Sequence, residues 1–475
     1  MRRWNVGRLE AWTVASVVLL LSNIPTFQLS AQDTSAIDRG VRIGIVYRPG
    51  VRPGLVMLPR KGMGLDSVRA IVARDLDYSD RFEVITLPGG DSIRLATAPT
   101  ATRGTGTRRS GSATAATGGA QSGGTLNYPL YQALGADFAL DITAAGDTTV
   151  ATLHDIAAAG IRRTVRANLP RPGDPDFRMA VHRLADQALQ AAIGTPGIAA
   201  TRVLFVKDGK VYQIDQDGVD QKLVSSTDRQ AMSPAWGADG RHFAYMEFQA
   251  GKGWLYLQEM GTGAGKRTAV STTGTALDFT PAFSPDGQTL AFSRATEEGT
   301  DLYTINIKNN CCLRRLTVGR FSDNLSPTFS PDGQRIAFVS TRPGLPQIYV
   351  MAADGTDQQL FAPFDYGVTG ASNAPEWSPD GQSVAFHRDV AGTLQVFVLD
   401  VRTRTVRQLT SVGRNEDPTW APDSRHLAFV SDRSGYRQLW IIDLDTGRIR
   451  PLLQQSGARL PAWSPRLSEA PSSTP

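Results

Sequence analysis

The residue types that most often perform catalysis or hold metals are few in this chain and widely spaced. Five histidines are scattered along 475 residues, and none belongs to a His-x-x-x-His pair or has a cysteine nearby. Surface or packing roles are therefore favoured over metal ligation. The chain also lacks a Gly-x-Ser-x-Gly segment, the usual nucleophile signature of α/β-hydrolases. The histidines are His154, His182, His242, His387 and His426.

The two cysteines of the chain, Cys311 and Cys312, are adjacent. They cannot build a disulfide framework, and their number excludes a Cys-rich structural zinc site. Two thiols in a loop are the simpler interpretation, and a vicinal disulfide in an oxidising compartment is the alternative.

Aspartates gather in two patterns, and both are typical of turns. Asp215, Asp217 and Asp220 surround Gly218, but this segment lacks the third spaced carboxylate and the distant Glu of a calcium loop, so a hairpin turn is favoured. A second set recurs at one position of a repeated phrase, where each carboxylate is expected to cap the same tight turn. Its members are Asp239, Asp286, Asp332, Asp380 and Asp423.

The repeated phrase, Pro-x-aromatic-Ser-Pro-Asp-Gly with variations, organises the second part of the chain. Its leading prolines are 47, 46, 48, 43 and 43 residues apart. A period of roughly 40–50 residues made of short strands predicts a β-propeller, one blade to each repeat. The copies begin at Pro234, Pro281, Pro327, Pro375, Pro418 and Pro461.

The two ends of the repeat array predict the number of blades. In each copy the Pro-x-aromatic segment is expected to form the innermost strand, and three more strands follow. The sixth copy breaks off after its first strand, whereas residues 203–224 supply a second, third and fourth strand without a first. Joined, they form one composite blade that closes the ring and leaves no open sheet edge. We therefore predict an all-β six-bladed propeller over residues 201–465, with a C-terminal tail at 466–475.

The region before the propeller predicts a signal peptide and an α/β domain. Residues 1–31 combine a basic start, a short apolar run and small residues before Gln32, so an exported, soluble mature protein is expected. Residues 32–200 follow as a mixed α/β domain. Residues 99–125 contain seven Gly, seven Thr and five Ala without an acidic or aromatic residue, which predicts a disordered insertion.

Hydrophobic periodicity places the elements of this α/β domain. One helix is expected where Leu65, Val68, Ile71, Val72 and Leu76 share a face. A second is expected to start with Asp174 as N-cap and Pro175 in the first helical position, and to end at Gly194. Strands are expected at 41–47, 55–58, 82–85, 137–142 and 149–154.

The propeller loops are the best candidates for a binding surface. The formal net charge of the whole chain is only +5, and arginines of the 99–125 tract contribute to it, so charge does not suggest a nucleic-acid partner. The loops that join one blade to the next should project from one face around the axis. They differ in sequence while the neighbouring strands are alike, which suits protein recognition on a rigid ring. These loops precede each leading proline, at 276–280, 322–326, 369–374 and 414–417.

Taken together, these features resemble those of the TolB family, the periplasmic propeller component of the Tol–Pal envelope system. The repeats resemble the family's Pro-x-Trp-Ser-Pro-Asp-Gly units, and the segment 194–202 resembles the link between its two domains. Segment 71–76 and Phe82 resemble its first helix and following strand. Asp80 stands where the family commonly has Gly, and residues 99–125 look like an insertion.

The resemblance implies no enzyme activity, no cofactor and two protein partners. A Pal-like peptidoglycan-associated lipoprotein would bind one face of the propeller, and a TolA-like inner-membrane protein would bind the N-terminal segment 41–51, in support of outer-membrane integrity and of envelope constriction at cell division. The segment could also be an internal strand of the N-terminal domain. Carried over by position, the candidate contact residues are Leu277, Asp278, Thr280, Asn324, Leu325, Asn373 and Glu416 for the propeller, and Val41, Arg42 and Ile43 for the segment.

Two other classes of protein compete with this interpretation. A secreted propeller hydrolase or lyase would use a pocket in the central channel, where acids, histidines or metal ligands should converge. The first strands instead show mostly Ala, Thr, Ser and aromatic residues. A carbohydrate-binding propeller is the other alternative, and the sequence offers no separate signature for it.

Overall fold

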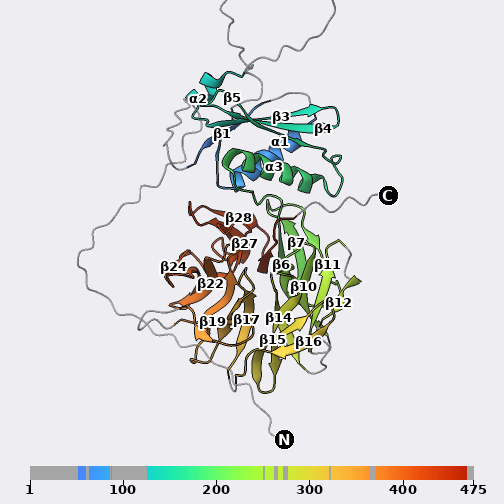
Figure 1. Cartoon of the computed structure of the whole chain (residues 1–475), viewed down its shortest axis with the longest axis vertical. Helices are drawn as coiled ribbons and strands as arrows, with labels where there is room; N and C mark the ends of the chain where they lie inside the picture. Colours follow the sequence, from blue (N-terminus) through green and yellow to red (C-terminus); the bar gives the residue numbers. More distant parts are fainter. Residues whose placement is uncertain are drawn as a thin grey trace, which may run out of the picture. The chain divides into compact units, whose positions relative to one another are not determined.

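A computed structural model describes residues 52–59, 64–85, 87, 126–249, 252–261, 266–270, 276–319, 322–362 and 370–467. They form an α/β domain and a β-propeller (Figure 1). The predicted signal, the strand at 41–47, the insertion at 99–125 and most of the C-terminal tail lie outside these residues. Within the described ranges, no helix combines the length and apolar character needed to cross a membrane.

The α/β domain is built on one five-stranded sheet with the order β2-β1-β3-β4-β5. Strand β1 runs parallel to β2 and β3, and the β3-β4-β5 meander is antiparallel. Its elements are β1 (Gly54–Met57), α1 (Asp66–Tyr78), β2 (Glu83–Ile85), α2 (Tyr128–Ala133), β3 (Phe138–Ala145), β4 (Thr148–Asp155), β5 (Gly160–Ala167) and α3 (Phe177–Ile193).

Alternation along the strands gives the sheet two buried faces. Leu55 of β1 packs with α1 and α3 in one cluster, whereas the next residue, Val56, packs with Tyr131 of α2 in another. Successive side chains of a strand point to opposite faces, so helices cover both sides of this sheet. This is why the strand reads as a nearly continuous apolar run.

The structure confirms the two predicted helices and corrects the start of the second. Helix α3 begins at Phe177, with Asp176 as N-cap and no capping side chain. Asp174 instead accepts a hydrogen bond from the backbone N–H of Arg171 at 2.9 Å, so it stabilises the preceding turn. Gly194 ends the helix with φ 82°, as predicted.

The propeller consists of six four-stranded sheets, and the last one is the composite blade predicted from the repeat. Strand β29 pairs with β6, which joins the end of the repeat array to its beginning. Blade 1 comprises β9 (Ala231–Trp236), β10 (His242–Gln249), β11 (Lys252–Glu259) and β12 (Thr268–Ala269). Blade 2 comprises β13 (Leu277–Phe283), β14 (Thr289–Thr296), β15 (Gly299–Asn306) and β16 (Cys311–Arg315).

The remaining blades repeat the same four-strand pattern. Blade 3 comprises β17 (Asn324–Phe329), β18 (Arg335–Ser340), β19 (Gln347–Ala352) and β20 (Gln359–Leu360). Blade 4 comprises β21 (Ser372–Trp377), β22 (Ser383–Val390), β23 (Thr393–Asp400) and β24 (Val406–Gln408). Blade 5 comprises β25 (Asn415–Trp420), β26 (His426–Ser431), β27 (Gln438–Asp443) and β28 (Ile449–Leu453). Blade 6 comprises β29 (Arg459–Trp463), β6 (Arg202–Lys207), β7 (Lys210–Asp215) and β8 (Lys222–Leu223).

The repeated aspartates cap the turn between the first two strands of a blade, as predicted. Asp286 accepts a hydrogen bond from the N–H of Gln288 at 3.0 Å, and Asp332 does the same for Gln334. The cysteine interpretation was wrong, because Cys311 and Cys312 form a vicinal disulfide and lie in strand β16.

Candidate functional site

The inner end of every blade carries the same backbone irregularity. The residue before each leading proline has a positive φ, and the strand pairing shifts register beside it, which marks a β-bulge. The side chain at this position differs from blade to blade. These residues and their prolines line a cavity of about 150 Å³ at one end of the axial channel. The six are Ser233, Thr280, Ser326, Ala374, Asp417 and Leu460, with φ between 47° and 53°.

This bulge corrects the predicted loops. Pairing continues past the proline, so the predicted contact residues of the propeller lie in the innermost strands β13, β17, β21 and β25. Thr280 lines the end of the channel, and its hydroxyl lies 2.6 Å from that of Ser293. Leu277, Leu325 and Asn373 are half-buried. Val41, Arg42 and Ile43 lie outside the described residues.

Three of the predicted contact residues are engaged inside the blades. Asp278 is 1% exposed and accepts two hydrogen bonds from Arg294, at 2.6 and 2.8 Å. Asn324 is fully buried and donates to Asp301 at 3.0 Å. Glu416 accepts a hydrogen bond from Arg414 at 3.0 Å. The bonds of Asp278 and Asn324 join neighbouring strands, whereas the bond of Glu416 is local, to a residue two positions before it.

Blades 4 and 5 place two carboxylates in the channel: Glu376, which the sequence analysis did not single out, and Asp417, which lies in the predicted binding loop 414–417. Burial raises the pKa of Glu376 to about 7, although its carboxylate accepts hydrogen bonds from the N–H of Trp420 and the hydroxyl of Thr419. Burial, helped by the neighbouring Glu416, also raises the pKa of Asp417 to about 7. Both line the narrow end of the channel, so its charge changes near neutral pH.

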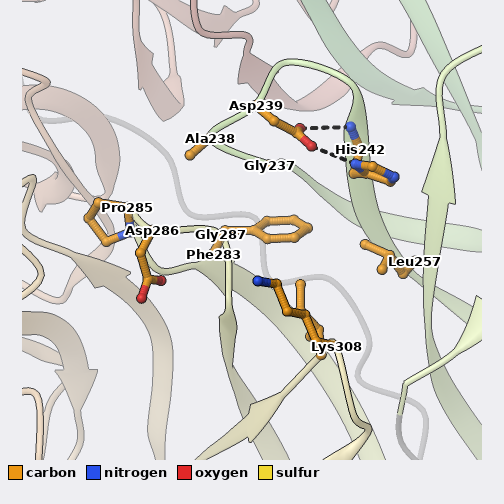
Figure 2. Close-up of a pocket in the computed structure, with 11 residues that line it drawn as sticks. Gly237, Ala238, Asp239, His242, Leu257, Phe283, Pro285, Asp286, Gly287 and Lys308 are labelled. Atoms are coloured by element: carbon orange, nitrogen blue, oxygen red, sulfur yellow. Dashed lines mark hydrogen bonds and ion pairs between the residues drawn. The ribbon is translucent and has the colours of Figure 1, made fainter.

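A larger cavity, of about 580 Å³, lies between blades 1 and 2 (Figure 2). At three other junctions a proline from one blade packs against a glycine in the turn of the next. Pro285, for example, would lie 3.7 Å from a β-carbon built on Gly333. At the junction of blades 1 and 2, Ala238 takes the place of that proline, and a β-carbon on Gly287 would meet no atom within 4 Å. The missing proline ring therefore leaves this junction less closely packed than the others.

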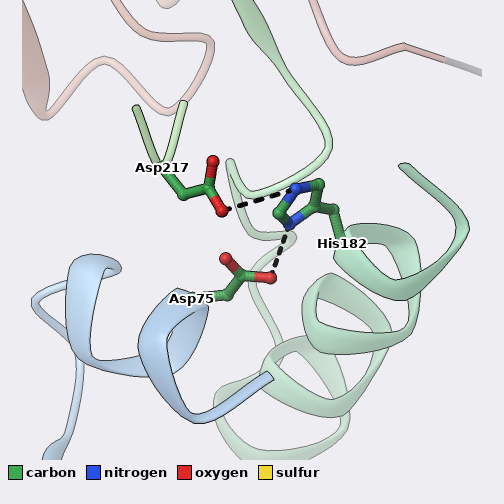
Figure 3. Close-up of side chains that lie close together, drawn as sticks. All are labelled: Asp75, His182 and Asp217. Atoms are coloured by element: carbon green, nitrogen blue, oxygen red, sulfur yellow. Dashed lines mark hydrogen bonds and ion pairs between the residues drawn. The ribbon is translucent and has the colours of Figure 1, made fainter. Parts of the chain in front are cut away.

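The α/β domain contacts the propeller through a buried ion-pair cluster around His182 (Figure 3). The Nδ1 atom of His182 lies 2.7 Å from the Asp75 carboxylate, and its Nε2 atom lies 3.7 Å and 3.8 Å from Asp215 and Asp217 in the β7–β8 turn. Burial disfavours the charged imidazole, but the nearby Asp215 carboxylate and the hydrogen bond to Asp75 outweigh it and raise the pKa of His182 to about 9. We name this group the His182 cluster.

Three arginines complete the His182 cluster. Arg74 of α1 and Arg178 of α3 both pair with Asp217, and Arg202 pairs with Asp215 at 3.0 Å. The β7–β8 turn is the hairpin turn predicted for these aspartates, and Gly218 in it has φ 82°. The carboxylates of Asp215 and Asp217 therefore contribute to the contact between the domains, whereas Asp220 pairs with Lys222 within the propeller.

A second cluster, the His426 cluster, has the histidine on the propeller. Its Nδ1 atom lies 2.7 Å from Asp423, and its Nε2 atom lies 3.2 Å from Asp443 and 3.5 Å from Asp80 of the α/β domain. Arg448 pairs with Asp80 at 3.0 Å. Asp80 has φ 53°, a region that favours glycine.

Three histidine and carboxylate ligand atoms in each cluster lie within 4.8 Å of one another, a spacing that a metal ion could use. The surrounding groups favour ion pairs instead. Arg74 and Arg178 already neutralise Asp217, and a protonated His182 has no free lone pair to offer. Sequence spacing could not reveal the cluster, because Asp75 and His182 are 107 residues apart.

The channel carboxylates and the cavity between blades 1 and 2 could have been found in the sequence, because their residues differ from those at the same position of the other repeats. Glu376 occupies a position where the other blades have Ala or Thr, and Asp417 precedes its proline where others have Ser, Thr, Ala or Leu. Gly237 and Ala238 stand where most copies read Ser-Pro. Residues that differ at equivalent positions of a repeat are free of the common packing role, which makes them candidates for function.

The fold defines a class, the six-bladed β-propellers preceded by an α/β domain. The family model described as TolB beta propeller domain matches residues 190–366 and 365–469, which together span more than half of the chain. The chain therefore belongs to the TolB β-propeller family.

Relatives and solved structures agree with this assignment. The chain is 29% identical over 276 residues to the Tol-Pal system protein TolB of Methylococcus capsulatus, covering 56% of each chain. It is 31% identical over 191 residues to the protein of the same name from Francisella tularensis subsp. mediasiatica, covering 38% of this chain and 42% of the relative. The matches thus span about half the length of these relatives. The crystal structure of TolB from Acinetobacter baumannii superposes with a TM-score of 0.69 at 23% identity, covering 88% of this chain and 98% of the other, which shows a common fold.

Proposed function

We propose that this protein is a non-enzymatic, periplasmic scaffold of a Tol–Pal-type envelope system that binds a Pal-like lipoprotein at the end of its propeller channel. The observation that carries the proposal is the ring of six equivalent positions with one backbone conformation and different side chains. Rigid strands that present variable side chains suit recognition of a protein surface. Family membership and the names of the relatives support the choice of partner.

The contact residues are best sought at the channel end. Thr280 and Asp417 are half-buried in its lining, whereas Asp278 and Asn324 act by holding the strands behind it. A Thr280→Arg, Asp417→Arg double variant would add two long cations to the ring. Leu223→Arg on the outer strand β8, where the leucine is 39% exposed, is a matched control away from the channel.

The test is calorimetric titration of the soluble domain of the organism's Pal-like lipoprotein into residues 32–475. Binding by the unchanged chain and by the Leu223 variant, with at least a tenfold loss in the double variant, would support the site. Failure of the unchanged chain to bind would overturn the proposed partner. Equal loss in the control would place the contact elsewhere.

The N-terminal partner rests on the family resemblance. We propose that Val41, Arg42 and Ile43 belong to a segment that a TolA-like protein takes up by edge pairing. Replacing all three by Ser should abolish binding of a TolA-like domain. Titrating the Pal-like domain into the same variant tests linkage between the two sites, and equal affinities would argue against coupling.

An enzyme remains the second candidate because of the two channel carboxylates. A hydrolase or lyase would need Glu376 and Asp417 as an acid–base pair, and their raised pKa values suit that role. Polysaccharides and their oligomers are the probes to offer. Turnover that disappears in Glu376→Gln would favour the enzyme over the scaffold.

A further inference from the structure

Strand β5 is an edge of the five-stranded sheet, far along the chain from the channel residues. It pairs with β4 on one side, and within the described residues no strand pairs with its other side. An edge strand presents backbone N–H and C=O groups that can pair with another chain. The strand is also exposed, and Ile161 in it is 63% accessible.

A groove follows this edge between β5 and helix α3. Its volume is about 520 Å³. Next to it, the Nε atom of Arg162 donates to the carbonyl of Ala191 at 3.2 Å, and the guanidinium of Arg162 pairs with Asp155. The groove is lined by Arg163, Thr164, Val165 and Arg166 of the strand and by Gln187, Gln190, Ala191 and Gly194 of the helix and its cap.

The groove is positively charged, and its lining contains no acidic residue. Arg163 is paired in register with Leu153, whose side chain packs against α3, so Arg163 lies on that face of the sheet. Arg166 is paired with Val150 and lies on the opposite face. A strand added beside β5 would alternate its side chains between these two faces, so it could offer a carboxylate to each arginine.

We propose that the groove between β5 and α3 binds an extended acidic segment of a partner protein, which adds to β5 as a sixth strand. The backbone edge supplies hydrogen bonds, the two arginines supply charge selectivity, and the glutamines supply further donors and acceptors. The charged area consists of two arginines on one strand, so it matches the width of a single extended peptide. The proposal does not rest on the Tol–Pal assignment, because it uses residues of the α/β domain alone.

The test uses the full chain from residue 32 and a labelled seven-residue Glu-Val peptide, Val-Glu-Glu-Val-Glu-Glu-Val, which places carboxylates on both faces of an extended strand. Fluorescence anisotropy at low salt should show binding, and hydrogen exchange should show protection of the β5 amides. Arg163→Glu with Arg166→Glu should weaken binding at least tenfold, and the milder Arg163→Gln with Arg166→Gln should weaken it less. Arg171→Glu, an exposed arginine outside the groove, is the matched control.

Two control peptides separate the parts of the proposal. A Lys-Val peptide of the same length that bound as well would overturn the charge selectivity. A Glu-Val peptide with N-methylated backbone that bound as well, or the absence of protection in β5, would overturn strand addition. Absence of any binding by the Glu-Val peptide would overturn the site.

Discussion

The His182 and His426 clusters use the same residue types for the same contact, but they distribute them differently. In the first, the histidine belongs to the α/β domain and two of its carboxylates to the propeller. In the second, the histidine belongs to the propeller and only Asp80 comes from the other domain. The donors to the carboxylates also differ. Each carboxylate of the His426 cluster has a donor besides the histidine, whereas the hydrogen bond of Asp75 comes from His182. Similar composition therefore predicts unequal energies.

The largest expected effect is the loss of His182. Its imidazole supplies the hydrogen bond to Asp75, whose other oxygen is buried without a partner. His182→Leu leaves a buried carboxylate uncompensated, and we expect it to reduce the free energy of unfolding by about 3–5 kcal/mol. Urea unfolding followed by tryptophan fluorescence measures it.

A double variant controls for this interpretation. Asp75→Leu combined with His182→Leu removes both partners, and it should recover much of the lost stability because no buried charge is left alone. A double variant less stable than either single variant would show that packing, rather than charge, accounts for the loss.

The next prediction concerns how the stability contributed by His182 depends on pH. The pKa of His182 is raised from 6.5 to about 9 in the folded chain. A raised histidine pKa contributes stability that is fully present below pH 6.5 and is lost as the pH rises through about 9. The unfolding midpoint of the unchanged chain should therefore fall across this window relative to that of His182→Leu. Parallel curves for the two proteins would contradict the assignment.

His426 should matter less than His182 despite equal burial. After His426→Leu, Asp443 keeps Arg425, Asp80 keeps Arg448, and Asp423 keeps the N–H of Arg425 at 3.1 Å. We expect a loss of about 1–3 kcal/mol, the range for buried groups that retain part of their hydrogen bonding. A loss equal to that of His182→Leu under the same conditions would remove the distinction between the clusters.

The sequence predicted most of the fold because the fold repeats. Six copies of one phrase gave the blades, their turns and the composite closure, and hydrophobic periodicity gave α1 and α3. Strand β5 was missed because Arg162, Arg163 and Arg166 interrupt the alternation that marks a strand. The short helix α2, which starts next to the insertion, was missed as well.

The candidate sites were predicted less well for a different reason. The residues before each proline were taken as loop residues, because a bulge that continues the strand leaves no mark in a single copy. Contacts between domains join residues that are far apart in the chain, such as Asp80 and Arg448, which are 368 residues apart. For the channel, the sequence does carry a signal, because Glu376 and Asp417 differ from the residues at the same positions of the other repeats.

The smallest expected effect comes from Asp80, where the backbone and the side chain oppose each other. Asp80→Gly removes the carboxylate from Arg448 and His426, but it also relieves the positive φ of 53°. Arg448 keeps Asp77 at 2.8 Å, so the net change should stay within about 1 kcal/mol.

Asp80→Ala separates the two contributions. Alanine loses the same contacts but keeps the backbone strain, so it should be less stable than the glycine variant by about 1 kcal/mol. Equal stabilities would mean that the backbone conformation costs nothing at this position. The stability of either variant would then report only the loss of the Asp80 contacts with Arg448 and His426.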